Sequence, residues 1–388
     1  MDLGFFKGVQ KRPINTVVII ISFIVILVCI YTLWKMIRFA RFYYYLVSAK
    51  PYVLNGYKSS PVLEEDSRTL TWLIHMYPPI HNAGAEWMAH AMNRYLINTS
   101  GWKVNVVLNK ASVNEFERVV IIDRRNKNFV EKAVRNSGVL ISHLDNEPNA
   151  VQTAIVTKRP LVLVMHNNYR TRYLSQFIRM LPKNLYLIHN SYWIKEYYSS
   201  FNIPSIVVYP PVYWKEYETE TTREYVTLIN LNKNKGGDVL VKIAKQMPDV
   251  SFMGVKGGYD NQIVDTSVKN INYVENTSFI KTMYAKTDIL LVPSKEESWG
   301  RVAVEAMSSG IPVIAHPTPG LLESCGNAGI FCERGDIGAW VTAIRRLKTD
   351  AGYYKSVSDL CKARAKELDP VPQLKEMAVW LQGIKWNT

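Results

Sequence analysis

Residues 293–320 read PSKEESWGRVAVEAMSSGIPVIAHPTPG, and this stretch decides the fold class of the chain. Its pattern predicts a loop after a buried strand, a helix that begins near Gly300, and a further strand at 312–316. Ligands in open α/β sheets bind beyond the carboxyl ends of the strands, where this loop lies. Two carboxylates, Glu297 and Glu305, stand on either side of the helix start. The stretch therefore predicts a nucleotide-sugar site, in which helix amides bind phosphate and carboxylates bind hydroxyls.

The alternation of strand and helix extends over most of the chain. Such alternation predicts parallel sheets covered by helices. The pattern pauses at Tyr209-Pro210-Pro211-Val212 and then restarts. We therefore expect an α/β protein with two doubly wound, Rossmann-like domains that face each other across a cleft, with a hinge near 211–222. The predicted strands are 70–76, 102–108, 118–122, 139–142, 161–166 and 185–189 in the first domain, and 225–230, 250–254, 271–274, 288–292 and 312–316 in the second.

These patterns divide the chain into four parts. Residues 1–60 are expected to form a membrane anchor and neck, and 61–213 an acceptor-side domain. Residues 214–371 are expected to form a nucleotide-sugar-binding domain. The amphipathic tail, 372–388, is expected to form a helix that packs back on the first domain.

The anchor prediction rests on Ile14–Trp34, a run of 21 residues without a charge. About 20 apolar residues cross a bilayer as a helix. The alternatives are a cleaved signal peptide and a buried core helix. The apolar region of a signal peptide is usually shorter than this run and is followed by a cleavage site with small residues. Residues 1–60 also hold eight basic residues and one acid, which suits anionic lipid head groups. We therefore expect a single-pass membrane protein, with the aromatic run 42–54 as a neck at the membrane surface.

Charge and cysteine content restrict the other function classes. The net charge is +14, and half of it lies in residues 1–60, so the remainder is too diffuse to indicate nucleic-acid binding. The four cysteines show no metal-ligand spacing, and one lies in the apolar run. Reduced thiols favour a catalytic part on the cytosolic face. Occupancy of the glycosylation sequons at Asn98 and Asn276 would instead place that part in a lumen.

The start of the helix near Gly300 allows two interpretations. The amides of Gly300, Arg301 and Val302 would lack intrahelical acceptors and could bind a phosphate. Glu305, about one turn further on, could reach ribose hydroxyls, or it could pair with Arg301 at i, i+4 as an ordinary helix salt bridge. For an isolated pair the salt bridge is the usual outcome, but the flanking Gly300, Gly310 and Gly320 favour the ligand site.

The segment ESWGRVAVEAMSSGIPVIA also resembles the signature of the family 4 retaining glycosyltransferases (glycosyl transferases group 1), which have the GT-B fold. The Glu-x7-Glu spacing of Glu297 and Glu305 is kept, and the resemblance extends over about 69–370, most strongly at 287–323. It implies that Glu297 contacts the transferred sugar in a catalytic role and that Glu305 contacts the ribose. It is specific for the fold and the superfamily rather than for the substrate.

The resemblance extends to the loop of residues 230–236, NLNKNKG. In the family a Lys and an Arg in this loop hold the diphosphate. Lys235 matches the lysine, but Asn230 stands where the arginine is expected. We hypothesise that Arg301, beside the helix start, supplies the missing cation. A solvated loop lysine is the alternative for Lys235, since lysines are mostly exposed.

Two segments of the first domain also resemble the family pattern, and His143 is a further candidate. Ala83-Gly84-Ala85-Glu86 resembles a Gly-Gly-x-Glu turn, in which a side chain at Gly84 would block the approach of donor phosphates, although a plain strand-to-helix turn also favours glycine. His166, at a strand end, matches the family's catalytic histidine that contacts the donor sugar. His143 is a second candidate. A histidine at a strand end is more often a satisfied polar residue than a catalyst.

The combined prediction is a membrane-anchored, retaining hexosyltransferase that moves a sugar from a nucleotide-diphosphate donor to a glycan or lipid-linked acceptor. The chain has no Asp-x-Asp motif, so we expect no cofactor and no metal ion on the diphosphate. Cationic side chains and helix amides would then stabilise the negative charge of the diphosphate. A nucleotide-sugar epimerase on the same fold and a degenerate sugar- or nucleotide-binding scaffold are the alternatives.

Overall fold

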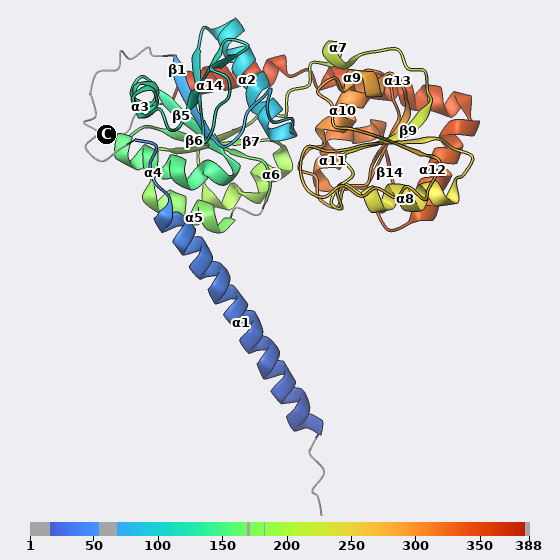
Figure 1. Cartoon of the computed structure of the whole chain (residues 1–388), viewed down its shortest axis with the longest axis horizontal. Helices are drawn as coiled ribbons and strands as arrows, with labels where there is room; N and C mark the ends of the chain where they lie inside the picture. Colours follow the sequence, from blue (N-terminus) through green and yellow to red (C-terminus); the bar gives the residue numbers. More distant parts are fainter. Residues whose placement is uncertain (1–15, 54–67, 169–170, 182, 385–388) are drawn as a thin grey trace, which may run out of the picture. The chain divides into compact units, whose positions relative to one another are not determined.

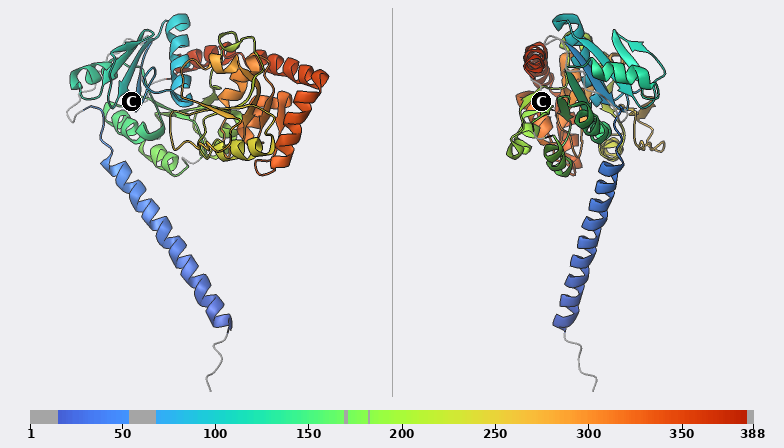
Figure 2. Two further views of the ribbon diagram at one scale, coloured as in Figure 1. Left: turned by 45° about the vertical axis from the view of Figure 1, so that its right-hand side comes forward. Right: turned by 90° about the vertical axis from the view of Figure 1, so that its left-hand side faces the viewer.

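The computed structural model describes residues 16–53, 68–168, 171–181 and 183–384, and they form two units. The first unit ends at Lys50 and contains helix α1 (Thr16–Ser48), which is 33 residues long. Both further views show α1 as one continuous helix (Figure 2). The second unit, from Pro51 onward, contains both sheets (Figure 1).

The expected anchor, Ile14–Trp34, begins outside the described residues, and from Thr16 onward it lies within α1. The helix continues past Trp34 to Ser48, so it also includes part of the expected neck. The rest of the neck and the linker to the first sheet include residues 54–67, which lie outside the described residues. Within the part of the chain that the structure describes, no helix combines the length and the apolar character that crossing a bilayer requires.

The first sheet has eight strands in the order β3-β4-β2-β1-β5-β6-β7-β8. Every pair of neighbours is parallel except β3 with β4. The strands are β1 (Thr69–Ile74), β2 (Lys103–Leu108), β3 (Glu115–Phe116), β4 (Val119–Asp123), β5 (Val139–His143), β6 (Leu161–Met165), β7 (Leu185–His189) and β8 (Ser205–Val207). The helices between them are α2 (Gly84–Ser100), α3 (Lys127–Arg135), η1 (Leu144–Asn146), α4 (Glu147–Thr157), α5 (Thr171–Met180), α6 (Tyr192–Tyr197) and η2 (Ser199–Phe201).

The second sheet has six strands, all parallel, in the order β11-β10-β9-β12-β13-β14. The strands are β9 (Tyr225–Ile229), β10 (Phe252–Val255), β11 (Ile271–Val274), β12 (Thr287–Val292), β13 (Val313–Ala315) and β14 (Gly329–Phe331). The helices are α7 (Trp214–Tyr217), α8 (Gly237–Gln246), α9 (Lys281–Tyr284), α10 (Arg301–Ser308), α11 (Pro319–Cys325), η3 (Gly326–Ala328), α12 (Ile337–Thr349), α13 (Ala351–Glu367) and α14 (Val371–Gln382). The parallel α/β architecture predicted from the alternating pattern is therefore confirmed.

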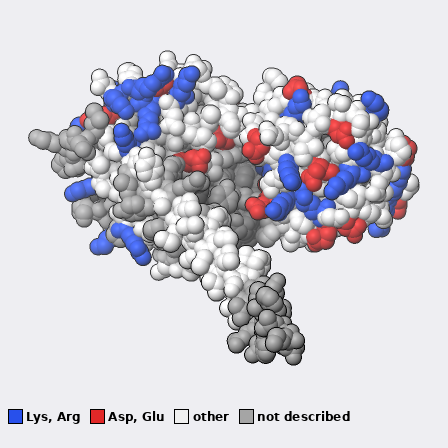
Figure 3. Space-filling view, turned by 60° about the horizontal axis from the view of Figure 1, so that its bottom comes forward, with Lys and Arg blue, Asp and Glu red and all other residues white. Residues whose placement is uncertain are grey.

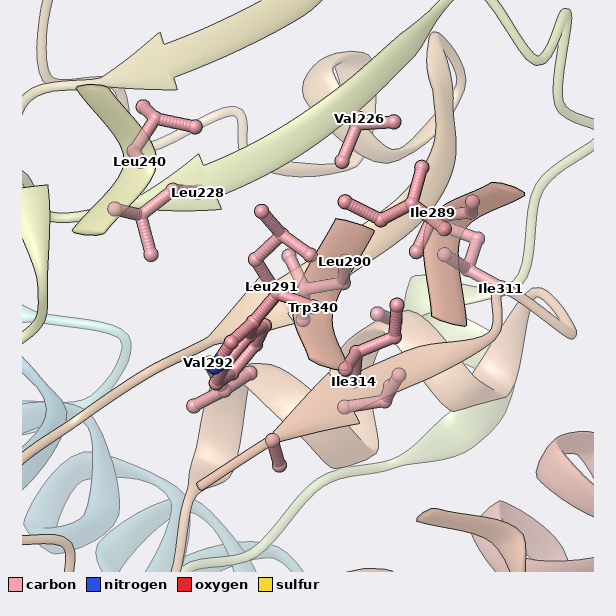
Figure 4. Close-up of a cluster of buried hydrophobic side chains, with 14 of the residues drawn as sticks. Val226, Leu228, Leu240, Ile289, Leu290, Leu291, Val292, Ile311, Ile314 and Trp340 are labelled. Atoms are coloured by element: carbon pink, nitrogen blue, oxygen red, sulfur yellow. The ribbon is translucent and has the colours of Figure 1, made fainter. Parts of the chain in front are cut away.

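Each sheet has its own hydrophobic core. Strands such as β12 are buried along their whole length, because helices cover both faces of a parallel sheet (Figure 1). The close-up of the second core shows Leu290 and Leu291 among side chains from several elements, with Trp340 of α12 beside them (Figure 4). Trp340 is fully buried, and its indole N–H donates to the carbonyl oxygen of Glu333 at 2.9 Å, so its polar atom is satisfied.

The final helix, α14, packs on the first sheet's core although it follows the second sheet in sequence. Leu374, Met377 and Leu381 belong to the same buried cluster as Trp72 of β1. The spacing of three and four residues places these side chains on one face of the helix. Exposed Val379 lies among them in sequence but outside that face. Residues 385–388 of the predicted tail lie outside the described residues.

The strands that the pattern missed are short. β3, β8 and β14 have two or three residues each. Alternation over so few residues carries no periodicity, so tertiary pairing defines them. Helix ends follow clearer signals: α2 ends at Gly101, which has a left-handed φ of 69°, and the Asp336 side chain caps α12 by accepting from the amide of Ala339.

On the face shown in Figure 3, Lys and Arg side chains gather at the upper left, and on the right they lie among Asp and Glu side chains. Among the described residues, Arg345 forms an exposed ion pair with Asp249.

His189, at the end of β7, makes stability depend on pH. Burial first, and then the nearby Lys195 charge, lower the pKa of His189 to about 4. Below pH 6.5 His189 binds a proton in the unfolded chain but stays neutral in the folded chain until the pH approaches 4. The free energy of unfolding should therefore fall by up to about 3 kcal/mol between pH 6.5 and 4 because of this group. The thermal midpoint of His189→Gln should vary less over that range than that of the wild type, and parallel profiles would contradict this account.

Candidate functional site

The carboxyl ends of β9 and β12 bring two predicted loops together. These strands are parallel neighbours, while β10 follows β9 on its other side, so the strand order reverses between β9 and β12. Ligand sites in open α/β sheets lie at such a switch point. The loop of residues 230–236 leaves β9 there, and the loop of residues 293–300 leaves β12. The amide of Lys295 donates to the carbonyl oxygen of Asn234 at 2.7 Å, so the two loops are in contact.

Lys235 and Glu297 form an ion pair across these loops. The Lys235 ammonium donates to Oε2 of Glu297, and the Ser294 hydroxyl donates to the same oxygen at 3.2 Å. Burial alone would lower the pKa of Lys235, but the Glu297 charge, Tyr259 and the hydrogen bond to Glu297 together raise it above its usual value. Lys235 is therefore charged at neutral pH. The structure places these two predicted residues in one site, and Lys235 is not the solvated loop lysine of the alternative.

Glycine is required where the first loop meets the second. Gly236 has a left-handed φ of 97°, and a Cβ built there would lie 2.5 Å from Cγ of Pro293. A side chain at Gly236 would thus force the loops apart and separate Lys235 from Glu297.

Helix α10 begins beside this pair. Gly300 precedes its first residue with a left-handed φ of 92°, and no side chain among the described residues caps the helix. The amides of Arg301 and Val302 lie in the first turn, where they have no intrahelical acceptor. The geometry required for an anion site at this helix start is present, and the donor-binding role of these three residues remains a prediction.

Arg301 and Glu305 adopt the i, i+4 salt bridge that was the simpler alternative. Arg301 donates to Oε1 of Glu305 and, at 2.6 Å, to the Tyr217 hydroxyl. The Tyr284 hydroxyl donates to Oε2 of Glu305 at 2.8 Å, so both carboxylate oxygens are engaged. Burial, followed by the Glu305 charge, raises the pKa of Tyr217 to about 12, so its hydroxyl stays protonated at neutral pH. Contact of Glu305 with a ribose, or of Arg301 with a diphosphate, requires a rearrangement of this network and remains a prediction.

The backbone conformation at position 230 favours asparagine. The φ of Asn230 is 69°, in the left-handed region that asparagine adopts more readily than arginine. Its Oδ1 accepts from the amide of Asn232 at 3.2 Å, which stabilises the turn that leads to Lys235. Replacing Asn230 by Arg would therefore strain the loop as well as add a charge.

The first sheet brings its predicted residues together at a second switch point. β1 pairs with β2 on one side and with β5 on the other. His75 follows β1, His143 ends β5, and His166 follows β6. His143 Nδ1 lies 3.0 Å from His166 Nε2, so the two histidine candidates are in contact. At Gly84, the first residue of α2, a Cβ would have no atom within 4 Å, so packing within the described part of the chain does not require glycine there.

Hydrogen bonds join loops of the two sheets. The Asn190 side-chain amide donates to the Ser298 hydroxyl at 2.7 Å and lies 3.5 Å from the carbonyl oxygen of His166. The Trp193 indole donates to the carbonyl oxygen of Ser298 at 2.7 Å. Because Ser298 follows Glu297 directly, these bonds connect the segments that carry the two predicted catalytic residues. Neither Asn190 nor Trp193 was predicted from the sequence. Asn190 directly follows β7, so it lies beyond the carboxyl end of a strand, where ligand sites of open α/β sheets are found.

Glu323 of α11 completes this connection. Its two carboxylate oxygens accept from the amides of Tyr192, at 2.7 Å, and Trp193, at 3.0 Å, in the first turn of α6. A carboxylate at a helix start is favourable because the first amides are otherwise unsatisfied. Gly320, earlier in α11, allows this approach, since a Cβ there would lie 2.3 Å from the Ser298 carbonyl carbon.

The second sheet lies within a region that matches a described family model. Residues 214–366 match the family model described as glycosyl transferases group 1. An uncharacterized glycosyltransferase of Haemophilus influenzae is 27% identical over 147 residues, which cover 34% of this chain and 41% of that protein. A D-inositol 3-phosphate glycosyltransferase of Corynebacterium kroppenstedtii is 40% identical over 73 residues, which cover 18% of this chain and 16% of that protein. The matches thus span less than half the length of these curated relatives.

Solved structures are similar over a larger share of the chain. HepE of Anabaena, solved in complex with UDP-glucose, has a TM-score of 0.66 at 15% identity, with coverage of 80% of this chain and 98% of that one. A glycosyltransferase of Rickettsia africae has a TM-score of 0.65 at 14% identity, with coverage of 82% and 100%. At this identity the likeness concerns the fold. It supports the expected GT-B arrangement of two Rossmann-like domains.

The buried network predicts that Arg301→Ala destabilises the second sheet. Loss of the guanidinium leaves Glu305, which is 5% exposed, without its cation, and breaking a buried pair in this way costs about 3–5 kcal/mol. Thermal unfolding of the purified chain should show a clearly lower midpoint. Arg345→Ala, which removes an exposed pair with Asp249, is the matched control and should leave the midpoint near that of the wild type. An equal decrease of the thermal midpoint in both variants would contradict the claim that burial makes the Arg301–Glu305 pair important for stability.

Proposed function

We propose that this protein is a glycosyltransferase that uses a nucleotide-diphosphate sugar. The observation that carries the proposal is the Lys235–Glu297 pair, which lies at the switch point of the second sheet and within the region that matches the family model. One HepE structure contains UDP-glucose and another contains UDP and glucose, which supports a donor of this class for the same fold.

The proposed reaction breaks the bond between the anomeric carbon and the diphosphate oxygen. An acceptor hydroxyl forms the new bond to that carbon and loses its proton, and the nucleotide diphosphate leaves. Lys235 and the amides of Gly300, Arg301 and Val302 stabilise the negative charge that develops on the leaving group. Glu297 orients the sugar and holds Lys235 in place before the donor binds. Asn230 shapes the loop rather than supplying charge.

The finer parts of the proposal follow the family resemblance. The sugar is a hexose, its anomeric configuration is retained, and the acceptor is a glycan or a lipid-linked sugar. The acceptor binds on the first domain, where His166 and His143 contact the donor sugar from the opposite side and Gly84 leaves room for phosphate. The diphosphate is held without a metal ion. Rearrangement of the Arg301–Glu305 network on donor binding would free Glu305 for the ribose and Arg301 for the phosphates.

Membrane anchoring is the part of the proposal that rests on the sequence. The run Ile14–Trp34 has no charge, and the large apolar side chains of α1 from Ile21 to Ile37 are exposed. A continuous apolar surface of this kind must be shielded from water, and the lipid of a bilayer can shield a single helix. The catalytic part then lies on the cytosolic face, in keeping with the free thiols of Cys325, Cys332 and Cys361.

Release of nucleotide diphosphate tests the transferase proposal. We expect release from at least one sugar nucleotide that increases on addition of an acceptor, with a product of the donor's anomeric configuration. Lys235→Ala should reduce donor affinity at least tenfold, because a charge-assisted contact with phosphate is lost. Lys233→Ala, an exposed lysine two residues earlier in the same loop, should bind the donor like the wild type.

The same assay separates the alternatives. An epimerase would interconvert sugar nucleotides without an acceptor, and a binding scaffold would bind the donor without releasing diphosphate. Either result would reject transfer. A donor affinity that is unchanged by Lys235→Ala would reject the proposed role of the ion pair even if transfer occurs.

Extraction of membranes at alkaline pH tests the anchor. The full chain should remain in the membrane pellet. The double variant Ile24→Arg, Val28→Arg should move to the supernatant, because each charge near the centre of a membrane helix costs about 2.5–3.5 kcal/mol. Met36→Arg, beside Lys35 and near the expected interface, is the control and should stay in the pellet. Full release of the wild-type chain would show that the segment does not anchor it.

A further inference from the structure

Five of the chain's seven histidines lie at or beyond the carboxyl ends of strands of the first sheet: His75, His81, His143, His166 and His189. Proposed donor binding uses His166 and His143 but leaves His75 and His81 without a role. Both of these follow β1, and both approach the carboxylate of Glu86 in the first turn of α2. This cluster belongs to a different sheet from the Lys235–Glu297 pair.

The cluster has the dimensions of a metal site. One ligand atom each from His75, Glu86 and His143 lies within 4.8 Å of the others. His75 Nε2 and Glu86 Oε1 are 3.9 Å apart. Zinc bonds of 2.0–2.1 Å in a tetrahedral arrangement set ligand atoms about 3.4 Å apart, so an ion would draw this pair together by about half an ångström. Among the residues that the structure describes, this is the one trio of His, Cys, Asp or Glu whose ligand atoms lie so close together.

Buried nitrogens that have no partner in the described part of the chain lie beside this trio, although the nitrogen of His75 that faces Glu86 is the other one, Nε2. Nδ1 of His75 and Nδ1 of His81 are buried, and neither has a hydrogen-bond partner among the described residues. The Glu86 carboxylate is almost fully buried, and its contacts with His75 and His81, at 3.9 and 3.7 Å, are longer than hydrogen bonds. Buried polar atoms in native proteins are nearly always satisfied by protein, water or an ion. A bound cation would satisfy the carboxylate and a ring nitrogen together.

His143 is oriented as a metal ligand would be. Its Nδ1 lies 3.0 Å from His166 Nε2. If Nδ1 donates that hydrogen bond, Nε2 is the unprotonated nitrogen of the neutral ring, and His166 acts as the outer partner that fixes the ring. Ligand histidines in metalloproteins usually have such a partner. Imidazole nitrogens with one carboxylate suit zinc and similar transition ions rather than Mg²⁺ or Ca²⁺, which prefer oxygen ligands.

We propose that His75, Glu86 and His143 form a binding site for a Zn²⁺-class divalent ion at the switch point of the first sheet. Three protein ligands leave a fourth position open to a water molecule or to an oxygen of a bound substrate. The three residues come from separate segments, so no local spacing in the sequence indicates the site. The proposal does not depend on transferase activity.

Metal binding by the tag-free full-length chain tests the proposal. We expect one equivalent of Zn²⁺ after gel filtration and a visible Co²⁺ spectrum with the intensity of a tetrahedral site. Zn²⁺ should also raise the thermal midpoint, because an ion that binds only the folded state stabilises it. Glu86→Gln and His143→Gln should each weaken Zn²⁺ affinity at least about 100-fold and abolish the stabilisation.

Two controls keep the result interpretable. His316→Gln removes a histidine on the second sheet and should bind Zn²⁺ like the wild type. Unfolding curves without metal should show that Glu86→Gln and His143→Gln are folded, and loss of affinity in both folded variants supports the site. Less than about 0.2 equivalents of Zn²⁺ on the wild type, or a Co²⁺ spectrum that persists in folded His143→Gln, would overturn the proposal.

Discussion

The parallel pairing of β9 with β12 is the constraint on which the proposed donor site depends. This pairing brings the loop of residues 230–236 against the loop of residues 293–300, although more than 50 residues separate them in sequence. The ion pair between Lys235 and Glu297 is a consequence of that pairing. Gly236 permits the close approach, because any Cβ there would collide with Pro293. The chemistry of this site is therefore set by backbone geometry before any ligand binds.

Two ion pairs near α10 have different environments. Arg301 and Glu305 are enclosed by Tyr217 and Tyr284, and each charge has several partners. Such a network is costly to disturb, because a buried charge that loses its partner keeps its desolvation penalty. The Lys235–Glu297 pair lies on loops and is partly exposed. Under the proposed function, this pair exchanges its partner for a phosphate or a sugar hydroxyl at lower cost than the buried pair would.

The first sheet has a histidine cluster at its own switch point, where the strand order reverses between β1 and β5. In both sheets the chemically useful side chains follow the strands on either side of the point where the order reverses. Asn190, Trp193 and Glu323 then link the segments that carry these groups through hydrogen bonds to Ser298 and to the start of α6.

Much of the fold followed from the sequence, because long buried strands and amphipathic helices carry their own periodicity. Parallel sheets and most strand positions were predictable for this reason. Short strands such as β14 were not, since their pairing is decided by neighbours. The family resemblance singled out Lys235 and Glu297, which the structure brings into contact, and their role in donor binding stays a prediction. Sequence spacing also left open whether Glu305 faces a ligand or Arg301. In the structure Glu305 pairs with Arg301 and accepts from the Tyr284 hydroxyl, and that second contact depends on tertiary packing. The His75–Glu86–His143 cluster likewise required the tertiary structure, because its members are brought together by the order of strands rather than by distance along the chain.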